Sequence, residues 1–148
     1  MVQGNDPIGA ILDNLAALER TMTPPTGLKL PHIYDEVPVD PDSPSIINVW
    51  RGGRPDTTTS STIETTELID VVFLFGRASE KYSERAQRLW IPVFVRLIHE
   101  NVKLNDGTVQ NVEVERWSAE PFPINEVPYI ATTFTLSVHL AAAFDYLP

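Results

Sequence analysis

Apolar residues recur at helical spacing near the start of the chain. Asp6 and Pro7 suit the cap and the first position of a helix, and the spacing continues to about Arg20. The sequence therefore predicts an N-terminal helix with one apolar stripe.

A second helical pattern begins at Ser79, a suitable cap, and runs to about Asn101. Its apolar stripe is wide, as a helix that covers a sheet requires. The stripe consists of Tyr82, Ala86, Leu89, Val93 and Leu97, with Trp90, Phe94 and Ile98 beside it. Pro92 lies inside this pattern and cannot donate to the carbonyl of Arg88, so we expect the helix to kink or break there.

The segment from Thr62 to Phe75 has a long strand-like pattern whose character changes halfway. "TIETTEL" is largely polar on both faces, whereas "IDVVFLF" is largely apolar on both. Only the second half can be buried within the domain, so we expect the first half to project or to lie on a neighbouring molecule. Thr62, Glu64 and Thr66 are therefore the candidate interface residues of this strand stem.

The last strand-like segment has the clearest alternation in the chain. One face carries Ile130, Phe134, Leu136, Val138, Leu140, Ala142, Phe144 and Tyr146. The other face carries Ala131, Thr133, Thr135, Ser137, His139, Ala141, Ala143 and Asp145. The first face is predicted to be core, and the second, which is small and polar, can pack on another subunit or face water.

Shorter signals complete the fold prediction. The segment 24–44 is rich in proline, so a strand over His32–Val37 would be short and at a sheet edge. Ser45–Arg51 is another strand candidate, and "NDG" at 105–107 is a turn before the strand "TVQNVEVERW". The order predicts a single α+β domain over 1–148, with a mainly antiparallel sheet packed against the long helix, an N-terminal helix and a long β-hairpin arm.

The stretch "WRGGRPDTTTSST" (50–62) suggests a phosphate site because two glycines lie between arginines. It has no GxxxxGK[ST] spacing, however, and Pro55 removes one of the N–H donors that a phosphate cradle would use. We predict instead a flexible hairpin loop over 52–61, at the tip of the arm, that contacts a neighbouring subunit or partner. The predicted contact residues are Arg51, Gly52, Gly53, Arg54, Asp56, Thr57, Thr58 and Thr59.

Composition narrows the classes of function. The chain of 148 residues has 43% hydrophobic and 21% charged residues, which is typical of a globular protein with a real core. Its net charge of −9 opposes tight binding to nucleic-acid phosphates, although DNA could pass beside it without sticking. The absence of cysteine excludes disulfides and thiolate sites. Neither a signal peptide nor a membrane span is recognisable, so we expect a cytoplasmic origin.

No catalytic, metal-binding or cofactor-binding residue is predicted. His32, His99 and His139 lack the spacing of a metal site, and "HEN" at 99–101 is not HExxH. Carboxylate pairs such as Glu113 and Glu115 have no local apolar pocket to shift their pKa values. Arg77, Lys81, Arg85 and Arg88 share roughly one helix face, which is typical of a solvated surface or of salt bridges to an acidic neighbour.

The order of these elements resembles that of tail terminator (tail completion) proteins of long-tailed bacteriophages. The resemblance lies in "SEKYSERAQRLWIPVFVRLIHENV", in the NDG-type turn into "TVQNVEVERW" and in the terminal "YIATTFTLSVHLAAAFDY". The N-terminal helix and the half-polar strand "STIETTELIDVVFLFG" agree with it. The proline-rich segment 24–44 and the helix interrupted by Pro92 depart from that pattern.

This resemblance implies a structural virion protein with no catalytic site. Its subunits would form a homohexameric ring that caps the tail tube and joins it to the head connector, with DNA only as passing cargo. It would be made in the host cytoplasm and reside in the tail or neck. A head-completion stopper or another neck protein stays open within the same class.

Two alternatives from other classes also stay open. One is an enzyme or small-molecule-binding domain with a pocket between a curved sheet and the long helix, in which His139 or Asp70 would be the polar groups. The other is an interaction module that forms no ring.

Overall fold

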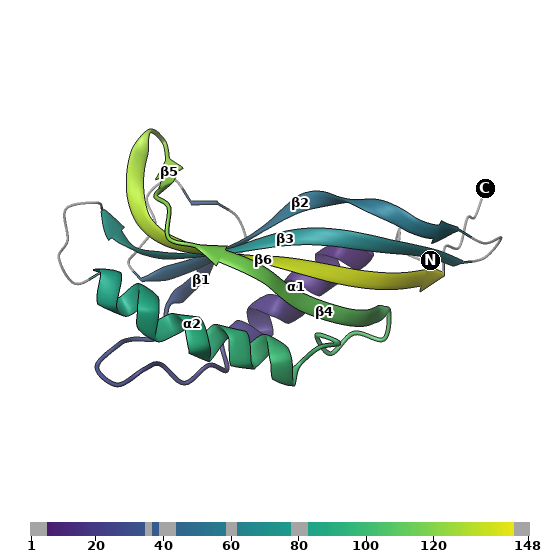
Figure 1. The fold of residues 1–148 in the computed structure, drawn as a ribbon, viewed down its shortest axis with the longest axis horizontal. Helices are drawn as coiled ribbons and strands as arrows, with labels where there is room; N and C mark the ends of the chain where they lie inside the picture. The colour runs from purple at the N-terminus through teal and green to yellow at the C-terminus, as the bar shows by residue number, and fades with distance from the viewer. Residues whose placement is uncertain (1–5, 35–36, 39–43, 59–61, 78–82, 144–148) are drawn as a thin grey trace.

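A computed structural model describes residues 6–34, 37–38, 44–58, 62–77 and 83–143. Six strands form one open sheet, and two helices lie against one of its faces (Figure 1). The strand order is β1-β2-β3-β6-β4, with β5 paired to β6, and every pairing is antiparallel except that of β1 with β2. The predicted α+β class, with a mainly antiparallel sheet packed against a long helix, is confirmed.

The element bounds follow the sequence pattern closely. The helices are α1 (Pro7–Glu19) and α2 (Ser83–Glu100). The strands are β1 (His32–Tyr34), β2 (Ser45–Thr58), β3 (Thr62–Arg77), β4 (Val109–Ser118), β5 (Phe122–Ile124) and β6 (Val127–Ala143). The predicted short edge strand near His32 and the Asp106-containing turn before β4 are both confirmed, and the Asp106 carboxylate accepts from the amide of Thr108 at 2.8 Å.

Helix α1 begins where its cap predicts. Asp6 accepts a hydrogen bond from the amide of Gly9 at 2.8 Å, and Pro7 occupies the first turn, where no amide donor is needed. Ile11 and Leu15 are buried against the sheet, as the apolar stripe requires.

Helix α2 differs from its prediction in two respects. It continues through Pro92, so the predicted break is wrong. Pro92 is exposed, and the Arg88 carbonyl that loses its helical donor lies on the solvent side, where water can bond to it. The fully buried stripe is formed by Trp90, Phe94 and Ile98, which the sequence placed beside the main stripe.

An aromatic cluster forms the centre of the core between α2 and the sheet. The ring of Phe73 on β3 lies 5.6 Å from Trp90 and 5.4 Å from both Phe94 and Phe134, measured between centroids. All four side chains are buried. Offset and edge-on contacts at these distances are the favourable geometries for aromatic pairs.

The apolar half of β3 is buried on both faces, as predicted. Val71 and Phe73 face the helices, whereas Val72 and Leu74 belong to a smaller core on the opposite face. That smaller core is covered by the β5–β6 hairpin, which curls over the sheet at the upper left of Figure 1. The remaining members of the smaller core are Ile47, Ile124, Tyr129 and Ala131.

The hairpin arm is longer and more regular than predicted. Strand β2 continues to Thr58 and pairs with β3, so the loop expected over 52–61 is wrong for residues 52–58, and residues 59–61 lie outside the described residues. Two register shifts, between Trp50 and Gly53 and between Pro55 and Thr57, adapt this stretch to its partner. Cross-strand pairing thus overrides the turn-like composition.

Strand β6 shows the predicted alternation over the residues described. Phe134, Leu136 and Val138 are fully buried toward the helices, with Thr132, which the sequence analysis did not count, on the same side. The opposite side, with Thr135 among its residues, is only partly covered. Phe144, Asp145 and Tyr146 lie outside the described residues.

The continuity of α2 yields a test of the role of Pro92. We expect Pro92→Ala to raise the free energy of unfolding by about 1–3 kcal/mol, because alanine restores the missing helical donor at an exposed site. Urea denaturation monitored by circular dichroism measures this change. Arg88→Ala, another exposed position of α2, is the control and should change stability by less than about 0.5 kcal/mol. A lower stability of Pro92→Ala would mean that the packing of α2 requires the proline geometry.

Candidate functional site

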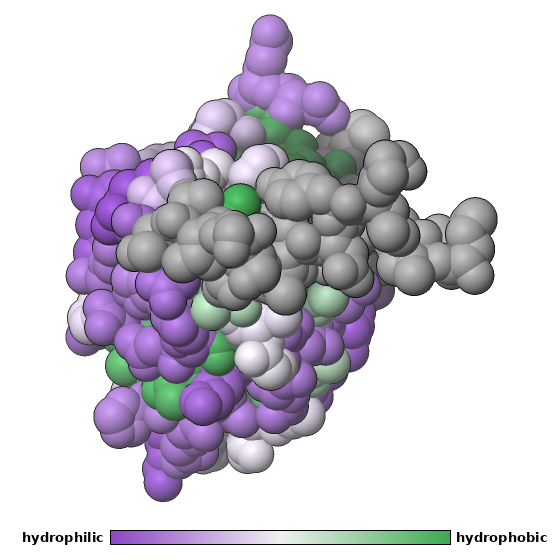
Figure 2. Space-filling view, turned by 90° about the vertical axis from the view of Figure 1, so that its right-hand side faces the viewer, coloured by the Kyte–Doolittle hydropathy of each residue, from purple (hydrophilic) through white to green (hydrophobic). Residues whose placement is uncertain are grey.

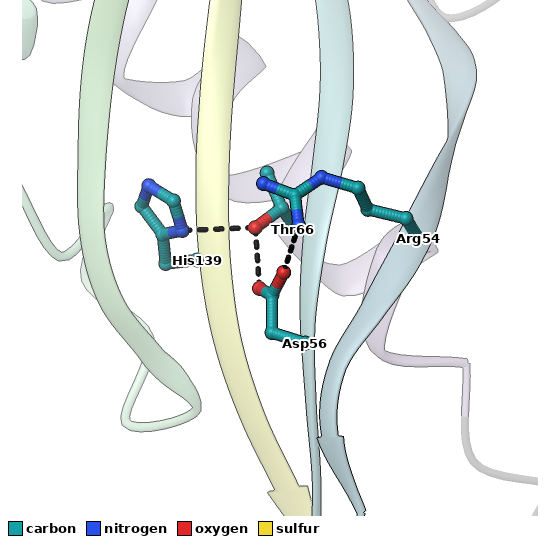
Figure 3. Close-up of polar contacts among 4 residues, drawn as sticks. All are labelled: Arg54, Asp56, Thr66 and His139. Atoms are coloured by element: carbon teal, nitrogen blue, oxygen red, sulfur yellow. Dashed lines mark hydrogen bonds and ion pairs between the residues drawn. The ribbon is translucent and has the colours of Figure 1, made fainter.

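The face of the sheet opposite the helices is uncovered along the arm, and we call it the uncovered face. It carries a chain of polar contacts that joins β2, β3 and β6 (Figure 3). The hydroxyl of Thr66 lies 2.5 Å from Asp56 Oδ2 and 3.0 Å from His139 Nδ1, and Arg54 bonds the other oxygen of Asp56. Thr66 is only 4% exposed, although this face has no helix above it.

The protons in this chain can be assigned from its members. A carboxylate only accepts, so Thr66 donates its single hydroxyl proton to Asp56. The hydroxyl oxygen then accepts from His139, which places a proton on Nδ1 of the imidazole. In the neutral tautomer Nε2 is the free acceptor. The arrangement fixes the orientation of His139 and ties three strands together.

A second network lies on the same face nearer the root of the arm. Arg51 Nε is 3.2 Å from Asp70 Oδ2, and the hydroxyl of Thr135 donates to Asp70 Oδ1 at 3.0 Å. These three side chains border a shallow depression of about 210 Å³. The other residues that line it are Arg116, Ser118, Glu120, Pro121, Phe122 and Thr133.

The two glycines of the arm have structural roles on the helix side of the sheet. Gly52 has φ +97° at the first register shift, a conformation that glycine adopts easily. Gly53 lies beneath the Glu67 carboxylate, because a Cβ added to Gly53 would lie only 2.3 Å from Glu67 Oε2. Glu67 also accepts from Trp50 Nε1 at 2.9 Å. The glycines therefore serve the bulge and this close approach.

The predicted contact residues are mostly engaged within their own chain. Arg51, Arg54, Asp56 and Thr66 belong to the two networks, and Glu64 Oε1 is 3.5 Å from Gln110 Nε2. Thr57, Thr58 and Thr62 lie in paired strands, and Thr59 lies outside the described residues. The uncovered face is thus a fixed polar surface over the described arm. Figure 2, which looks at the end of the arm, shows mainly hydrophilic surface with small apolar areas among the described residues.

The sequence analysis placed Thr135 and His139 on the small polar face of the last strand and named His139 and Asp70 as polar groups of the alternative pocket, but it did not bring them together with Arg54, Asp56 and Thr66, and it did not consider Arg116. The alternation of β6 does place His139 and Thr135 on one face. Asp70 has a weaker signal, as the one charge within the apolar run of β3. Their partners lie far away in the sequence, so only the strand register brings these groups together.

A buried acid lies on the opposite side of the sheet, between α1 and β2. Glu19 is 0% exposed, and its Oε1 accepts from Asn48 Nδ2 at 2.6 Å. Burial raises the pKa of Glu19 to about 8, against the opposing effects of the Asn48 hydrogen bond and the charge of Arg20. Position 19 continues the apolar stripe of α1, four residues after Leu15, but a glutamate at that position does not by itself suggest a buried side chain.

Protonation of Glu19 would give two buried oxygen atoms the hydrogen bond that they otherwise lack. Glu19 Oε2 and Asn48 Oδ1 are both buried without a hydrogen-bond partner. Both are acceptors while Glu19 is ionised, whereas a protonated Glu19 has a donor for the Asn48 oxygen. The amide side chain of Asn48 is therefore a suitable partner for a neutral acid.

This acid predicts a pH dependence of stability. Because the folded-state pKa lies above the ordinary 4.5, the unfolded chain releases the Glu19 proton first as pH rises. Stability should therefore fall between about pH 4.5 and pH 8, by roughly 4–5 kcal/mol from this group. Glu19→Gln, which is neutral at every pH and similar in shape, should remove most of this slope.

Urea unfolding at several pH values measures this effect, with Glu84→Gln on the exposed surface of α2 as the control. In the control, the unfolding free energy should change with pH as it does in the wild type. An unchanged slope in Glu19→Gln would show that Glu19 is ionised in the folded chain.

Two further observations bear on function. Within the described residues, no three histidine, aspartate or glutamate side chains gather closely enough to hold a metal ion. Neither of the described helices has the length and apolar character of a membrane span.

Comparison with known proteins adds no assignment: no protein-family model matches this chain, and no curated protein matches it significantly.

Proposed function

We propose that this chain is a tail terminator subunit that forms a ring, caps the tail tube and joins it to the head connector. The observation that carries the proposal is the uncovered face of the arm. Strands β2, β3 and β6 extend well beyond α2 (Figure 1), and their polar side chains are held by the Asp56–Thr66–His139 chain and its neighbours. A rigid surface of this kind suits repeated contact with another protein, because little side-chain freedom is lost on binding.

The composition also supports a structural role in a DNA channel. The net charge of −9 would disfavour adhesion of DNA to a channel formed by several copies. The proposed partners are other copies of the chain, the tail tube protein and the head connector, with DNA as passing cargo. The proposed location is the tail or neck of the virion after synthesis in the host cytoplasm.

One observation favours the alternative of a small-molecule-binding domain. A hollow of about 490 Å³ lies beside α1 and includes Asp13, Tyr34 and Asn48 among its lining residues. Asn48 connects it to Glu19, whose raised pKa is the kind of perturbation found at many functional sites. Between α2 and the centre of the sheet the space is filled by Phe73, Trp90, Phe94 and Phe134, whereas a hollow of about 390 Å³ lies between the end of α2 and β4, beside His99 and Glu113. A ligand screen would therefore target the hollow beside α1.

The oligomeric state is the direct test of the proposed function. We expect rings of about six subunits in sedimentation over a concentration series, with closed rings in electron images of the same sample. Adding purified tail tubes distinguishes rings that form alone from rings that form only on the tube. A chain that stays monomeric both alone and with tubes would contradict the proposal.

The charge of the uncovered face can be tested separately. We expect Arg54→Glu to lower the fraction of rings several-fold, because it reverses an exposed charge and breaks the contact with Asp56. Sedimentation at fixed concentration measures the ring fraction, and circular dichroism checks that the monomer is folded. Arg88→Glu, the same change on the helix-covered side, should leave the fraction unchanged. Equal effects of both variants would indicate a general response to net charge.

A further inference from the structure

The turn of the β5–β6 hairpin contains an unusual residue. Ile124 pairs with Val127, so only Asn125 and Glu126 form the turn, and their φ angles are +48° and +66°. Two positive φ values define a type I′ turn, in which glycine is the preferred second residue. Glutamate at this position costs roughly 1 kcal/mol relative to glycine.

No contact among the described residues compensates for this cost. Leu104 also has a positive φ, of +47°, but its side chain is completely buried in the core, and that burial offsets the strain. Glu126 is exposed, and its carboxylate forms no hydrogen bond or ion pair within the part of the chain that the structure describes. A contact with another molecule would account for a glutamate at this position.

A matching unpaired charge lies in the depression of the uncovered face. Arg116 on β4 is exposed and has no ion-pair partner among the described residues, whereas Arg51 across the depression is bound to Asp70. Ser118 and Thr133 line the same depression, as do the carboxylate residues Asp70, which Arg51 neutralises, and Glu120. A free guanidinium beside hydroxyl donors is well suited to a single carboxylate, which it can bind through two parallel hydrogen bonds.

We propose that Glu126 of one copy enters the depression of a second copy and pairs with Arg116 there. The hairpin that carries Glu126 packs on the smaller core through Ile124, but it lies at one edge of the molecule (Figure 1) and Glu126 itself is exposed, so its carboxylate can reach a neighbour. The short turn fixes the backbone that carries Glu126 before binding. Because the hairpin and the depression are different patches, the contact can repeat head to tail around a ring. The inference rests on the self-association included in the proposed function and names one of its contacts.

Charge exchange between the two residues tests this contact. We expect Glu126→Arg and Arg116→Glu each to weaken self-association at least tenfold, because each places like charges together. The double variant, which restores opposite charges, should recover to within about threefold of wild type. Sedimentation velocity over a concentration series measures the association. Glu115→Arg on the same strand is the matched control and should leave it unchanged.

Glu126→Gly separates the role of the side chain from that of the turn. It should raise the melting temperature because glycine relieves the positive φ, while weakening association as Glu126→Gln does. Retained association in Glu126→Gly and Glu126→Gln would overturn the inference.

The outcomes also distinguish the inference from the proposed function. If both single charge variants form rings normally, the proposed contact between Glu126 and Arg116 is wrong, but the proposed ring assembly still stands. The wild type could instead form only a dimer, which the single variants disrupt and the double variant restores. That result would support the contact between Glu126 and Arg116 and contradict the ring. A wild-type chain that stays monomeric, both alone and on tail tubes, would overturn both.

Discussion

The architecture depends on one constraint, which is that the second half of β3 is apolar on both faces. Neighbouring residues of this strand point to opposite sides, so Phe73 and Val72 need separate covers. The helices provide the cover for Phe73, and the curled β5–β6 hairpin provides the cover for Val72. The central strand therefore determines that the sheet is covered on both sides at one end.

The first half of β3 needs hydrogen-bond partners and not apolar cover. Its side chains are polar, so the arm needs no apolar cover on the uncovered face, but each partly buried polar group there needs a partner. Asp56, Thr66 and His139 satisfy one another across three strands. Asp70 is satisfied by Arg51 and Thr135 in the same way. A single strand with two chemical halves thus produces both the packed core and the polar arm.

Features set by local periodicity could be predicted from the sequence. The cap at Asp6, the burial of both faces of β3 and the alternation of β6 depend on residues close together in the chain, and all were confirmed. Features set by pairing between distant segments could not. Residues 52–58 have the composition of a turn, but pairing with β3 holds them in a strand.

The candidate site shows the same limit. Thr66 and His139 are 73 positions apart, so their contact follows from register and not from spacing. Glu19 lies on the apolar stripe of α1, but the stripe alone does not predict that a glutamate there is buried. Pro92 remains within α2 because its missing hydrogen bond faces solvent, a circumstance that depends on which side of the helix packs.

The location of the charges determines how strongly they can interact. Catalytic charges act most strongly in cavities from which water is excluded, because a low dielectric strengthens their interactions. The groups of the uncovered face are instead open to solvent on one side, where salt screens charges beyond about 8 Å. Contact with a second protein would remove that solvent and strengthen the interactions of Arg54, Asp56 and Asp70. If the chain assembles as proposed, these contacts would gain strength only when the neighbouring subunit covers them.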